Sequence, residues 1–410
     1  MIVTKPKTFR LPSNFMWGAI GAMTIASAAC GGTGTDPNPT PAVDAGPGGG
    51  DGDGGGGSAD QWDQRLNERE YDYSAALRTA SLRLRGELPS LTEIKFVGEA
   101  ADSQKKAAYE AIINSYLDDP AYSQQFGRQV FRFWQDAFKM GGTQMLDSAP
   151  AFAAQLTLEN RDFTELFTAT AGNCPTFDQG AGTATAQDCQ NGVPAHAGVL
   201  SSPGVNAHFV SNLAFRRVRW VQETFDCTAF PAEFKDTPED VGGAAPYVSP
   251  WPFESISGSR NGGEIDFHDA SAVVCANCHG TMNHMAPLFG NFDENGQYQQ
   301  NVAVTKPTEG TPLAQRTDWL PAGEPSAWRY GVQADDLPAL GQAMANDPYV
   351  AECMVARTWN WALGRQDIVD SLAIVPTEVI AEQTALFQGS GHNFKELIRM
   401  VFTSEDFVRY

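Results

Sequence analysis

Apolar residues recur at helical spacing in two separate parts of this 410-residue chain, residues 61–172 and residues 335–410. In the first part, Ser or Asp precedes the periodic stretches and Gly or Pro follows them, as at helix beginnings and ends. The aromatic residues from Phe126 to Phe138 fall on one helix face, so we interpret them as core. The expected helices run from Tyr71 to Arg85, from Ser103 to about Leu117, and from Asp119-Pro120 to Gly141-Gly142.

The second part repeats features of the first. Asp347-Pro348 matches Asp119-Pro120, and Asn393-Phe394-x-Glu396-Leu397 matches Asp162-Phe163-x-Glu165-Leu166. We interpret these matches as a degenerate duplication of a helical unit; the alternative is chance similarity between helix beginnings. The expected helices here run from Asp347-Pro348 to near Gly364, from Pro376 to Phe387, and from Asn393 to Phe402.

The remaining parts of the chain lack helical periodicity. Residues 173–265 are rich in Gly, Pro, Ser and Asn, which predicts long loops with one helix from Ser211 to about Phe225. Residues 31–60 are dominated by Gly, Asp, Pro and Thr, cannot bury apolar surface, and are expected to form a disordered linker. Residues 1–30 combine a basic start with a short apolar run, the pattern of an export signal.

The apolar run ends in Ser27-Ala28-Ala29-Cys30. Small residues directly before a cysteine resemble a bacterial lipoprotein signal, in which the cysteine becomes the lipidated N-terminus. Several acyl chains on Cys30 would hold the protein stably on a membrane. The alternative is ordinary cleavage near Ala28 with no lipid.

The net charge of the chain argues against some classes of binding partner. The chain carries a net charge of −21 and has a pI of about 4.6. Nucleic-acid binding depends on Lys and Arg neutralising phosphates, so this balance argues against a nucleic-acid partner. It also argues against adhesion to an anionic lipid surface by charge alone. It is typical of an acidic surface on an exported protein.

One short motif carries recognisable chemistry: Cys275-Ala276-Asn277-Cys278-His279 reads C-x-x-C-H, the attachment signature of a c-type haem. The two thiols are spaced to form thioethers with the haem, and His279 is placed to bind the iron axially. The sequence therefore predicts a mainly α protein in which two helical, bundle-like halves flank a loop-rich c-type haem segment. The expected organisation is a lipoprotein signal peptide (1–30), a linker (31–60), an N-terminal helical domain (61–172), a loop-rich region (173–265), a haem c segment (266–334) and a C-terminal helical domain (335–410).

Two other sites could use the same cysteines. A zinc site would combine Cys275 and Cys278 with one or two of His268, His279 and His284. A disulfide between the two motif cysteines is the other alternative.

Several residues are candidates for the sixth iron ligand. Met344, which we place in a turn before Asp347, is the first candidate, because a downstream Met is usual in the small cytochromes c that the motif resembles. His268 is the second candidate, followed by His208 and His392, and an open sixth position is the remaining alternative. A Met ligand would raise the reduction potential, and an open site would permit ligand chemistry.

Four cysteines lie outside the motif and Cys30. In an exported protein they suggest two disulfides, with three connectivities, or else free buried thiols. We favour Cys174–Cys189, because both lie in one loop rich in Gly, Thr and Asp. Cys227–Cys353 follows by elimination.

The motif and the stretch after it resemble one family. Cys275-Ala-Asn-Cys278-His279-x-x-Met282 is followed by Asn291-Phe292-Asp293-x-x-Gly296-x-Tyr298. This pattern is similar to the haem segment of the planctomycete-type cytochrome c family, although Gln299 replaces that family's usual Arg. Residues 283–286 also lack the D-P-x-G that often follows the motif there. Residues 196–201, 216–231 and 347–407 resemble flanking parts of the same family, which implies haem c and a helical architecture but no particular reaction.

The sequence thus favours a mono-haem c-type cytochrome that transfers electrons outside the cytoplasm to an unidentified redox partner protein. We expect it in the periplasm or at the cell surface, as an outer-membrane lipoprotein anchored through Cys30, and we assign no catalytic residue. One alternative is a peroxidase- or oxygenase-like haem enzyme, with Arg216, Arg217 and His208 as polar groups beside an open iron site. Another is a surface binding or scaffold module in which the haem is structural.

Overall fold

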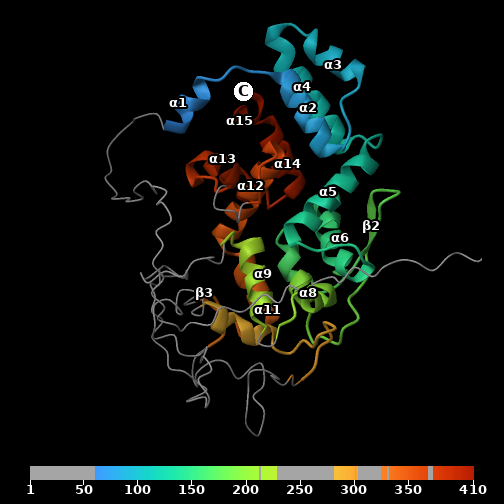
Figure 1. The fold of residues 1–410 in the computed structure, drawn as a ribbon, viewed down its shortest axis with the longest axis vertical. Helices are drawn as coiled ribbons and strands as arrows, with labels where there is room; N and C mark the ends of the chain where they lie inside the picture. The colour runs from blue at the N-terminus through green and yellow to red at the C-terminus, as the bar shows by residue number, and fades with distance from the viewer. Residues whose placement is uncertain are drawn as a thin grey trace, which may run out of the picture. The chain divides into compact units, whose positions relative to one another are not determined.

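The computed structural model describes residues 61–211, 214–228, 281–300, 302, 325–329, 332–367 and 373–410. All of them belong to one compact unit, residues 44–410. The export signal with Cys30, the linker, His268 and the C-x-x-C-H motif lie outside the described residues. Across the described part the fold is mainly α, as the sequence predicts (Figure 1). No helix there is long and apolar enough to cross a membrane.

The first helical part is built from seven α-helices followed by a small hairpin. The helices are α1 (Gln61–Asn67), α2 (Tyr73–Leu84), α3 (Leu91–Gly98), α4 (Asp102–Asp118), α5 (Ser123–Phe138), α6 (Gln144–Leu158) and α7 (Glu165–Thr168). The hairpin pairs β1 (Thr176–Asp178) with β2 (Thr183–Thr185), antiparallel, in a region expected to be loop.

The remaining elements return to the same helical body. They are η1 (Gly198–Ser201), α8 (Pro203–His208), α9 (Phe215–Phe225), η2 (Ala286–Phe289), β3 (Ala327–Arg329), β4 (Val332–Gln333), α11 (Leu337–Ala345), α12 (Pro348–Leu363), α13 (Thr377–Gly389), α14 (Phe394–Thr403) and α15 (Glu405–Val408). Residues 281–285 are also helical, and β3 pairs antiparallel with β4.

Helix α12 begins and ends where its sequence predicts. The Asp347 carboxylate accepts a hydrogen bond from the Tyr349 N–H at 2.9 Å, and Pro348 occupies the first helical position. Gly364 ends the helix in the left-handed conformation, at φ 69°. Local signals alone therefore determine both boundaries of α12.

The beginning of α5 was predicted wrongly. Asp119 accepts from the Ala121 N–H at 2.9 Å, which forms a side-chain-capped turn, and the helix begins only at Ser123. Its end lies at Lys139, which adopts φ 55° just before the two glycines. The Asp-Pro pair thus has different roles in α5 and α12, because after Asp119 the chain first completes a separate turn.

Two further expectations need correction. The helix expected from Ser211 begins at Phe215, because the Ser211 hydroxyl accepts the Arg216 N–H at 3.2 Å and Ala214 has a positive φ of 59°. Met344 lies in the last turn of α11 and not in an isolated turn. Helix α11 forms because the Asp336 carboxylate caps it, accepting from the Ala339 N–H at 2.8 Å.

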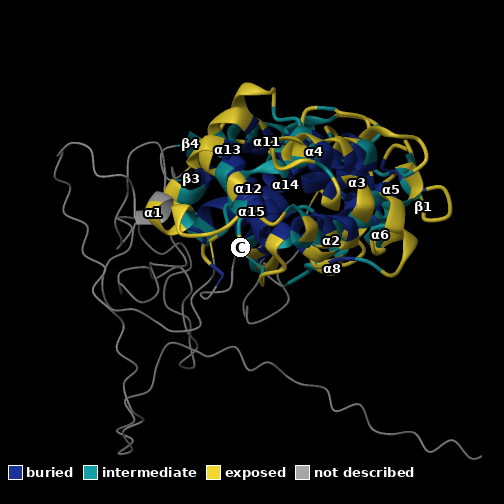
Figure 2. Cartoon of the chain, turned by 90° about the horizontal axis from the view of Figure 1, so that it is seen from above, coloured by how far each residue is buried: buried dark blue, intermediate teal, exposed yellow. Residues whose placement is uncertain are grey.

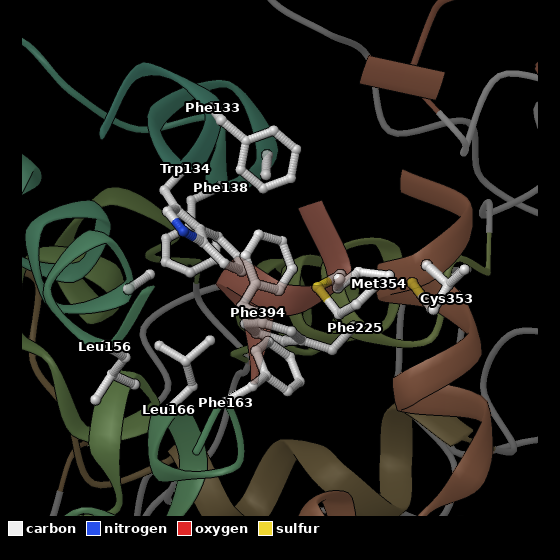
Figure 3. Packing of buried hydrophobic residues seen from close by; sticks show 14 of the residues in the cluster. Phe133, Trp134, Phe138, Leu156, Phe163, Leu166, Phe225, Cys353, Met354 and Phe394 are labelled. Carbon is white, nitrogen blue, oxygen red and sulfur yellow. The ribbon is translucent and has the colours of Figure 1, made fainter. Parts of the chain in front are cut away.

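One hydrophobic cluster includes residues from both helical parts of the chain. Helix α14 packs against α4 and α6, and α12 packs against α2 as well as α13, so the two parts share a core. In Figure 2 the buried residues lie within this body and the exposed residues cover it. Figure 3 shows Phe133 and Trp134 of α5 near Phe394 of α14, with ring centroids 5.6 Å and 4.8 Å from that of Phe394.

The matched segments of the proposed duplication meet at matched positions. Asp162 and Asn393 form an isolated antiparallel bridge, and the rings of Phe163 and Phe394 stack with centroids 6.1 Å apart. Each polar member also caps its own turn: Asp162 accepts from the Thr164 N–H, and Asn393 from the Glu396 N–H. The contact relates equivalent residues, as expected for two related units that face each other.

Candidate functional site

The described residues nearest the C-x-x-C-H motif are 281–300, and they are anchored in the helical body. Asn283, His284 and Met285 are buried, with exposed fractions of 0%, 2% and 0%. Phe289 and Phe292 belong to the shared hydrophobic cluster. The stretch 281–300 is therefore fixed to the core.

Arg217 of α9 contributes several hydrogen bonds to this anchoring. Its side chain is fully buried. Its Nη1 donates to the carbonyl oxygens of Phe289 and Phe292 at 2.8 Å and 3.0 Å, and its Nη2 donates to that of Asp293 at 2.9 Å. Its Nε and Nη2 also donate to the Asn206 carbonyl oxygen. A planar guanidinium with five donors can join several main-chain carbonyls in this way, which an ammonium group cannot.

The next turn is built on Asp293. Its Oδ1 accepts from the N–H groups of Asn295 and Gln297 at 2.8 Å and 2.9 Å. Gly296 has φ 70°, and a Cβ there would lie 2.1 Å from the Pro203 carbonyl oxygen. The turn therefore requires glycine for both conformation and space.

A loop between β2 and α8 supports this turn. The Asn191 side-chain amide donates to the carbonyl oxygens of Ser201 and Gly296 at 2.8 Å and 3.2 Å. The Asn191 carbonyl accepts from the Tyr298 N–H at 2.8 Å. Two segments chosen by their family resemblance, residues 196–201 and 291–298, are thus connected through Asn191.

Three buried polar atoms beside this loop have no hydrogen-bond partner in the described part of the chain: Asn191 Oδ1, Ser202 Oγ and Asn206 Oδ1. The amide nitrogens of Asn191 and Asn206 already donate to main-chain carbonyls, so their free atoms are acceptors. Buried polar atoms are normally paired, so these three are exceptions among the described residues.

Two disulfides join the four cysteines as expected from the sequence. Cys174 is bonded to Cys189 and Cys227 to Cys353, with Cα atoms 4.9 Å and 5.4 Å apart. The second bridge connects the chain just after α9 to α12. These four sulfurs are therefore unavailable to any other group.

The structure describes three of the candidate sixth iron ligands, Met344, His208 and His392. Met344 is fully buried in the core. The His208 Nε2 lies 3.1 Å from the Lys139 carbonyl oxygen, and the His392 Nδ1 lies 4.0 Å from the Asp162 carboxylate. No group of three His, Cys, Asp or Glu side chains suited to a metal occurs among the described residues.

The sequence analysis considered Arg216 and Arg217 of α9 as polar groups beside an open iron site. Arg217 is occupied by main-chain carbonyls. Arg216 is exposed and donates to the Val210 carbonyl oxygen at 3.4 Å.

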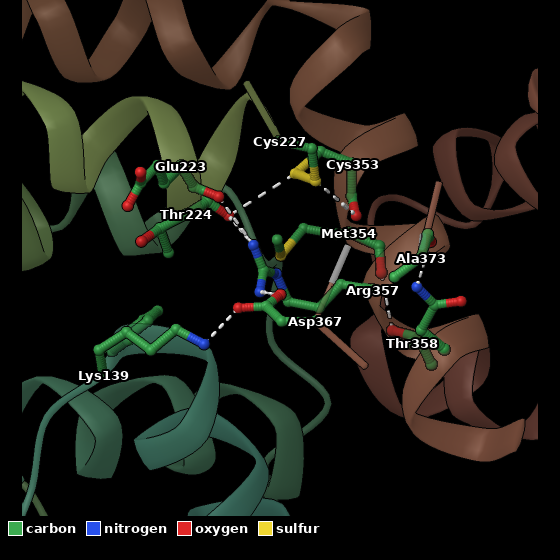
Figure 4. A network of polar contacts seen from close by, with 12 residues as sticks. Lys139, Glu223, Thr224, Cys227, Cys353, Met354, Arg357, Thr358, Asp367 and Ala373 are labelled. Carbon is green, nitrogen blue, oxygen red and sulfur yellow. Dashed lines mark hydrogen bonds and ion pairs between the residues drawn. A yellow bond between two sulfur atoms is a disulfide. The ribbon is translucent and has the colours of Figure 1, made fainter. Parts of the chain in front are cut away.

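A polar network lies at the other end of α9. The buried Arg357 of α12 donates to the carbonyl oxygens of Glu223 and Thr224, at 2.8 Å and 3.3 Å, and pairs with Asp367. Lys139 pairs with the same carboxylate (Figure 4). Burial lowers the pKa of the Arg357 guanidinium, and Asp367 opposes that change.

A cleft of about 760 Å³ opens beside this network, between the C-terminal ends of α5 and α12. Sequence reasoning missed it, because its walls come from helices far apart in the chain. The signal available was Arg357, which follows Asp347 by ten residues much as Arg128 follows Asp119 by nine. Arg128 is partly exposed, whereas Arg357 is buried.

No family model matches this chain, and no curated protein or solved structure matches it either.

Proposed function

We propose that this chain is a mono-haem c-type cytochrome that transfers single electrons outside the cytoplasm. The observation that carries the proposal is the arrangement of the cysteines. Because Cys174, Cys189, Cys227 and Cys353 bond to one another, the thiols of C-x-x-C-H cannot pair with them. Two thiols next to an imidazole are the donor set that covalent haem attachment uses.

The residues that would hold the haem are Cys275 and Cys278, through thioethers, and His279, through its imidazole. Met344 or His268 is proposed as the sixth ligand. A bound haem supplies an iron that cycles between Fe(III) and Fe(II).

The chain's own residues would fix the haem segment in place. Arg217 and Asn191 bind the main chain of residues 289–296. The side chains of residues 283–285 are buried, which would limit movement of this part of the chain. Such anchoring supports an electron carrier, because small rearrangement on changing oxidation state favours transfer.

The proposed location rests on the export signal, the lipoprotein-like Cys30 and the linker. A lipidated Cys30 would hold the folded body near a membrane, and residues 31–60 would keep it at a distance. The redox partner is proposed to be a protein, and the net charge of −21 favours a partner with a basic contact surface.

The test is purification of the full chain from cells that attach c-type haem. We expect the mass of one covalently bound haem and a Soret band that shifts on reduction. The double variant Cys275→Ala/Cys278→Ala should lose both signals. The matched control Cys174→Ala/Cys189→Ala removes two cysteines elsewhere and should keep them. Bound zinc without haem, or an intact Cys275–Cys278 disulfide, would refute the proposal.

A spectrum also separates the electron carrier from the haem enzyme. Six-coordinate, low-spin iron that is unchanged by cyanide or peroxide is expected for the carrier. Five-coordinate iron that binds cyanide would instead support the enzyme.

A further inference from the structure

A groove distinct from the cleft beside Arg357 lies between α13 and the start of α15. Its walls come from α1, α13, the end of α14 and the start of α15, which lie near the C-terminus (Figure 1). Its volume is about 610 Å³, within the range of pockets that receive ligands. None of residues 281–300 lines it, so it is separate in its residues from the segment that follows the C-x-x-C-H motif.

Part of the groove lining is apolar. Val379 and Leu386 of α13 line it together with Leu66 of α1 and Met400 of α14. Val379 and Met400 are partly buried against the shared hydrophobic cluster, whereas Leu386 is 50% exposed. A half-exposed leucine in a hollow provides apolar surface that a side chain of a partner can cover.

Among the described residues, every charged side chain that lines this groove is acidic. These side chains are Glu378, Glu382, Glu405 and Asp406. Helix α13, which forms one wall, contains no Lys or Arg. Glu405 pairs with Arg409 at 2.7 Å, so the two carboxylates of α13 carry the argument.

Glu378 and Glu382 are both exposed and lie four residues apart on α13. Like charges at this spacing destabilise a helix slightly, because neighbouring turns bring them together. Glu378 lies in the first turn, where the helix dipole favours a carboxylate, but Glu382 lies beyond it. Neither forms an ion pair in the described part of the chain, so a cation from another molecule would relieve their repulsion.

Gln383 adds a polar side chain without a partner. It lines the groove and is only 7% exposed, yet it forms no side-chain hydrogen bond within the described part of the chain. Its Oε1 is buried, whereas its Nε2 remains accessible. This amide nitrogen requires an acceptor, which a main-chain carbonyl oxygen of a peptide supplies.

Three other kinds of occupant fit this groove poorly. A metal ion is one, because no three Asp, Glu, His or Cys side chains of the described residues are placed to hold one. A second copy of this chain is another, because each copy carries a net charge of −21. An anionic lipid surface is the third, because the carboxylates repel it. Charge complementarity instead selects a basic segment of another protein.

We propose that this groove binds a basic peptide segment of a partner protein. An apolar side chain of the segment covers Leu386, and its main chain accepts a hydrogen bond from the Gln383 Nε2. Lysine or arginine side chains on either side of the apolar one pair with Glu378 and Glu382. This binding does not depend on the proposed haem.

The test is calorimetric titration of the full chain with a short synthetic peptide of alternating lysine and leucine pairs. Three altered probes separate the contributions: the same peptide with glutamate for lysine, the same peptide with serine for leucine, and spermidine, a polycation without side chains or carbonyl groups. We expect one lysine–leucine peptide per chain, with the altered probes weaker by about tenfold or more. The affinity should also fall as the salt concentration rises, because exposed charges are screened.

Variants locate the binding. Glu378→Gln/Glu382→Gln should weaken the lysine–leucine peptide by about fivefold, the effect of losing two exposed ion pairs. Leu386→Ser should weaken it by about tenfold, because the covered apolar surface is lost. Gln383→Met removes the amide donor and should weaken it by about fivefold.

The matched control is Glu99→Gln/Glu294→Gln. Both residues are exposed and neither lines the groove, while the change in net charge equals that of the groove variant. The affinity of this control for the peptide should be unchanged at physiological salt, where distant exposed charges are screened.

Four results would overturn the proposal. They are the absence of 1:1 binding by the lysine–leucine peptide, equal affinity for spermidine, equal affinity for the serine-substituted peptide, and equal losses in Glu378→Gln/Glu382→Gln and the matched control. Absorption spectra of the same samples report the haem independently. A protein without haem that binds the peptide would refute only the cytochrome proposal, and a haem protein that does not bind it would refute only the groove proposal.

Discussion

Arg217 donates from the middle of the core to the carbonyl oxygen of Phe292, 75 residues further along the chain, at 3.0 Å. The same guanidinium also binds the carbonyls of Phe289, Asp293 and Asn206. It therefore joins α8, α9 and the segment after the C-x-x-C-H motif at one point.

Replacing Arg217 with Met should be strongly destabilising. Met keeps much of the apolar volume but leaves four buried carbonyl oxygens without this donor, which we expect to lower the free energy of unfolding by about 3 kcal/mol or more. Urea unfolding measures the change.

The control for that variant is Arg216→Met on the same helix. Arg216 is exposed and its side chain donates to the Val210 carbonyl oxygen at 3.4 Å, so its loss should change the free energy of unfolding by only about 0.5 kcal/mol. Equal effects of the two variants would contradict the assigned role of Arg217.

Gly296→Ala tests the turn built on Asp293. A Cβ at this position meets the Pro203 carbonyl oxygen, and the positive φ adds backbone strain, so the loss should be about 2 kcal/mol or more. Gly389→Ala, at a position with open space and no positive φ, should be neutral or slightly stabilising. Thermal unfolding of both variants would decide the point; a neutral Gly296→Ala would mean that the turn moves freely away from Pro203.

The two disulfides should differ in their contribution. In the chain-entropy model, stabilisation grows with the length of the closed loop. The loop between Cys227 and Cys353 spans 126 residues, whereas that between Cys174 and Cys189 spans 15. Removing the first by paired Ala substitutions should cost nearly 5 kcal/mol, and removing the second about 3 kcal/mol. The reverse order in guanidinium unfolding would show that local packing outweighs loop entropy.

The capping box of α3 predicts a pH dependence. Although burial raises the pKa of Glu93, hydrogen bonds from Ser90 and Tyr122 and the charge of Arg85 together lower it. A folded-state pKa below the unfolded one gives stability that is present above the ordinary Glu pKa and is lost as the pH falls through the folded value. Glu93→Gln keeps the cap but removes the charge.

At pH 7 this variant should be less stable than the native chain by about 1 kcal/mol or less, because water partly screens the pair. The difference should shrink as the pH falls from about 5 to about 3. Free energies of unfolding measured across this range provide the check, and a difference that stays constant would exclude a role for the Glu93 charge.

Short-range sequence signals predicted where the helices lie, but not how the helices pack together. Asp347, Pro348 and Gly364 are sufficient to define α12, because caps and breakers act within a few residues. The hairpin of β1 and β2 was missed, since its strands have three residues each and no alternating pattern long enough to recognise.

Of the two candidate sites, one could be predicted from the sequence and the other could not. C-x-x-C-H is visible in the sequence because attachment chemistry requires neighbouring residues. The cleft is not visible, because Arg83, Phe133 and Arg357 come together only when three distant helices pack. The role of Arg217 was equally hidden: its partners are main-chain carbonyls, which carry no sequence signal.

The Cys227–Cys353 bond has a topological consequence. It closes the chain into a covalent ring that contains the C-x-x-C-H motif, with both ends of the ring fixed to helices of the core. A protease cut within the ring would leave a two-piece molecule of unchanged mass, apart from one added water, until the disulfide is reduced. The segment that carries the motif is therefore tethered at both sides, and breaking one peptide bond does not release it.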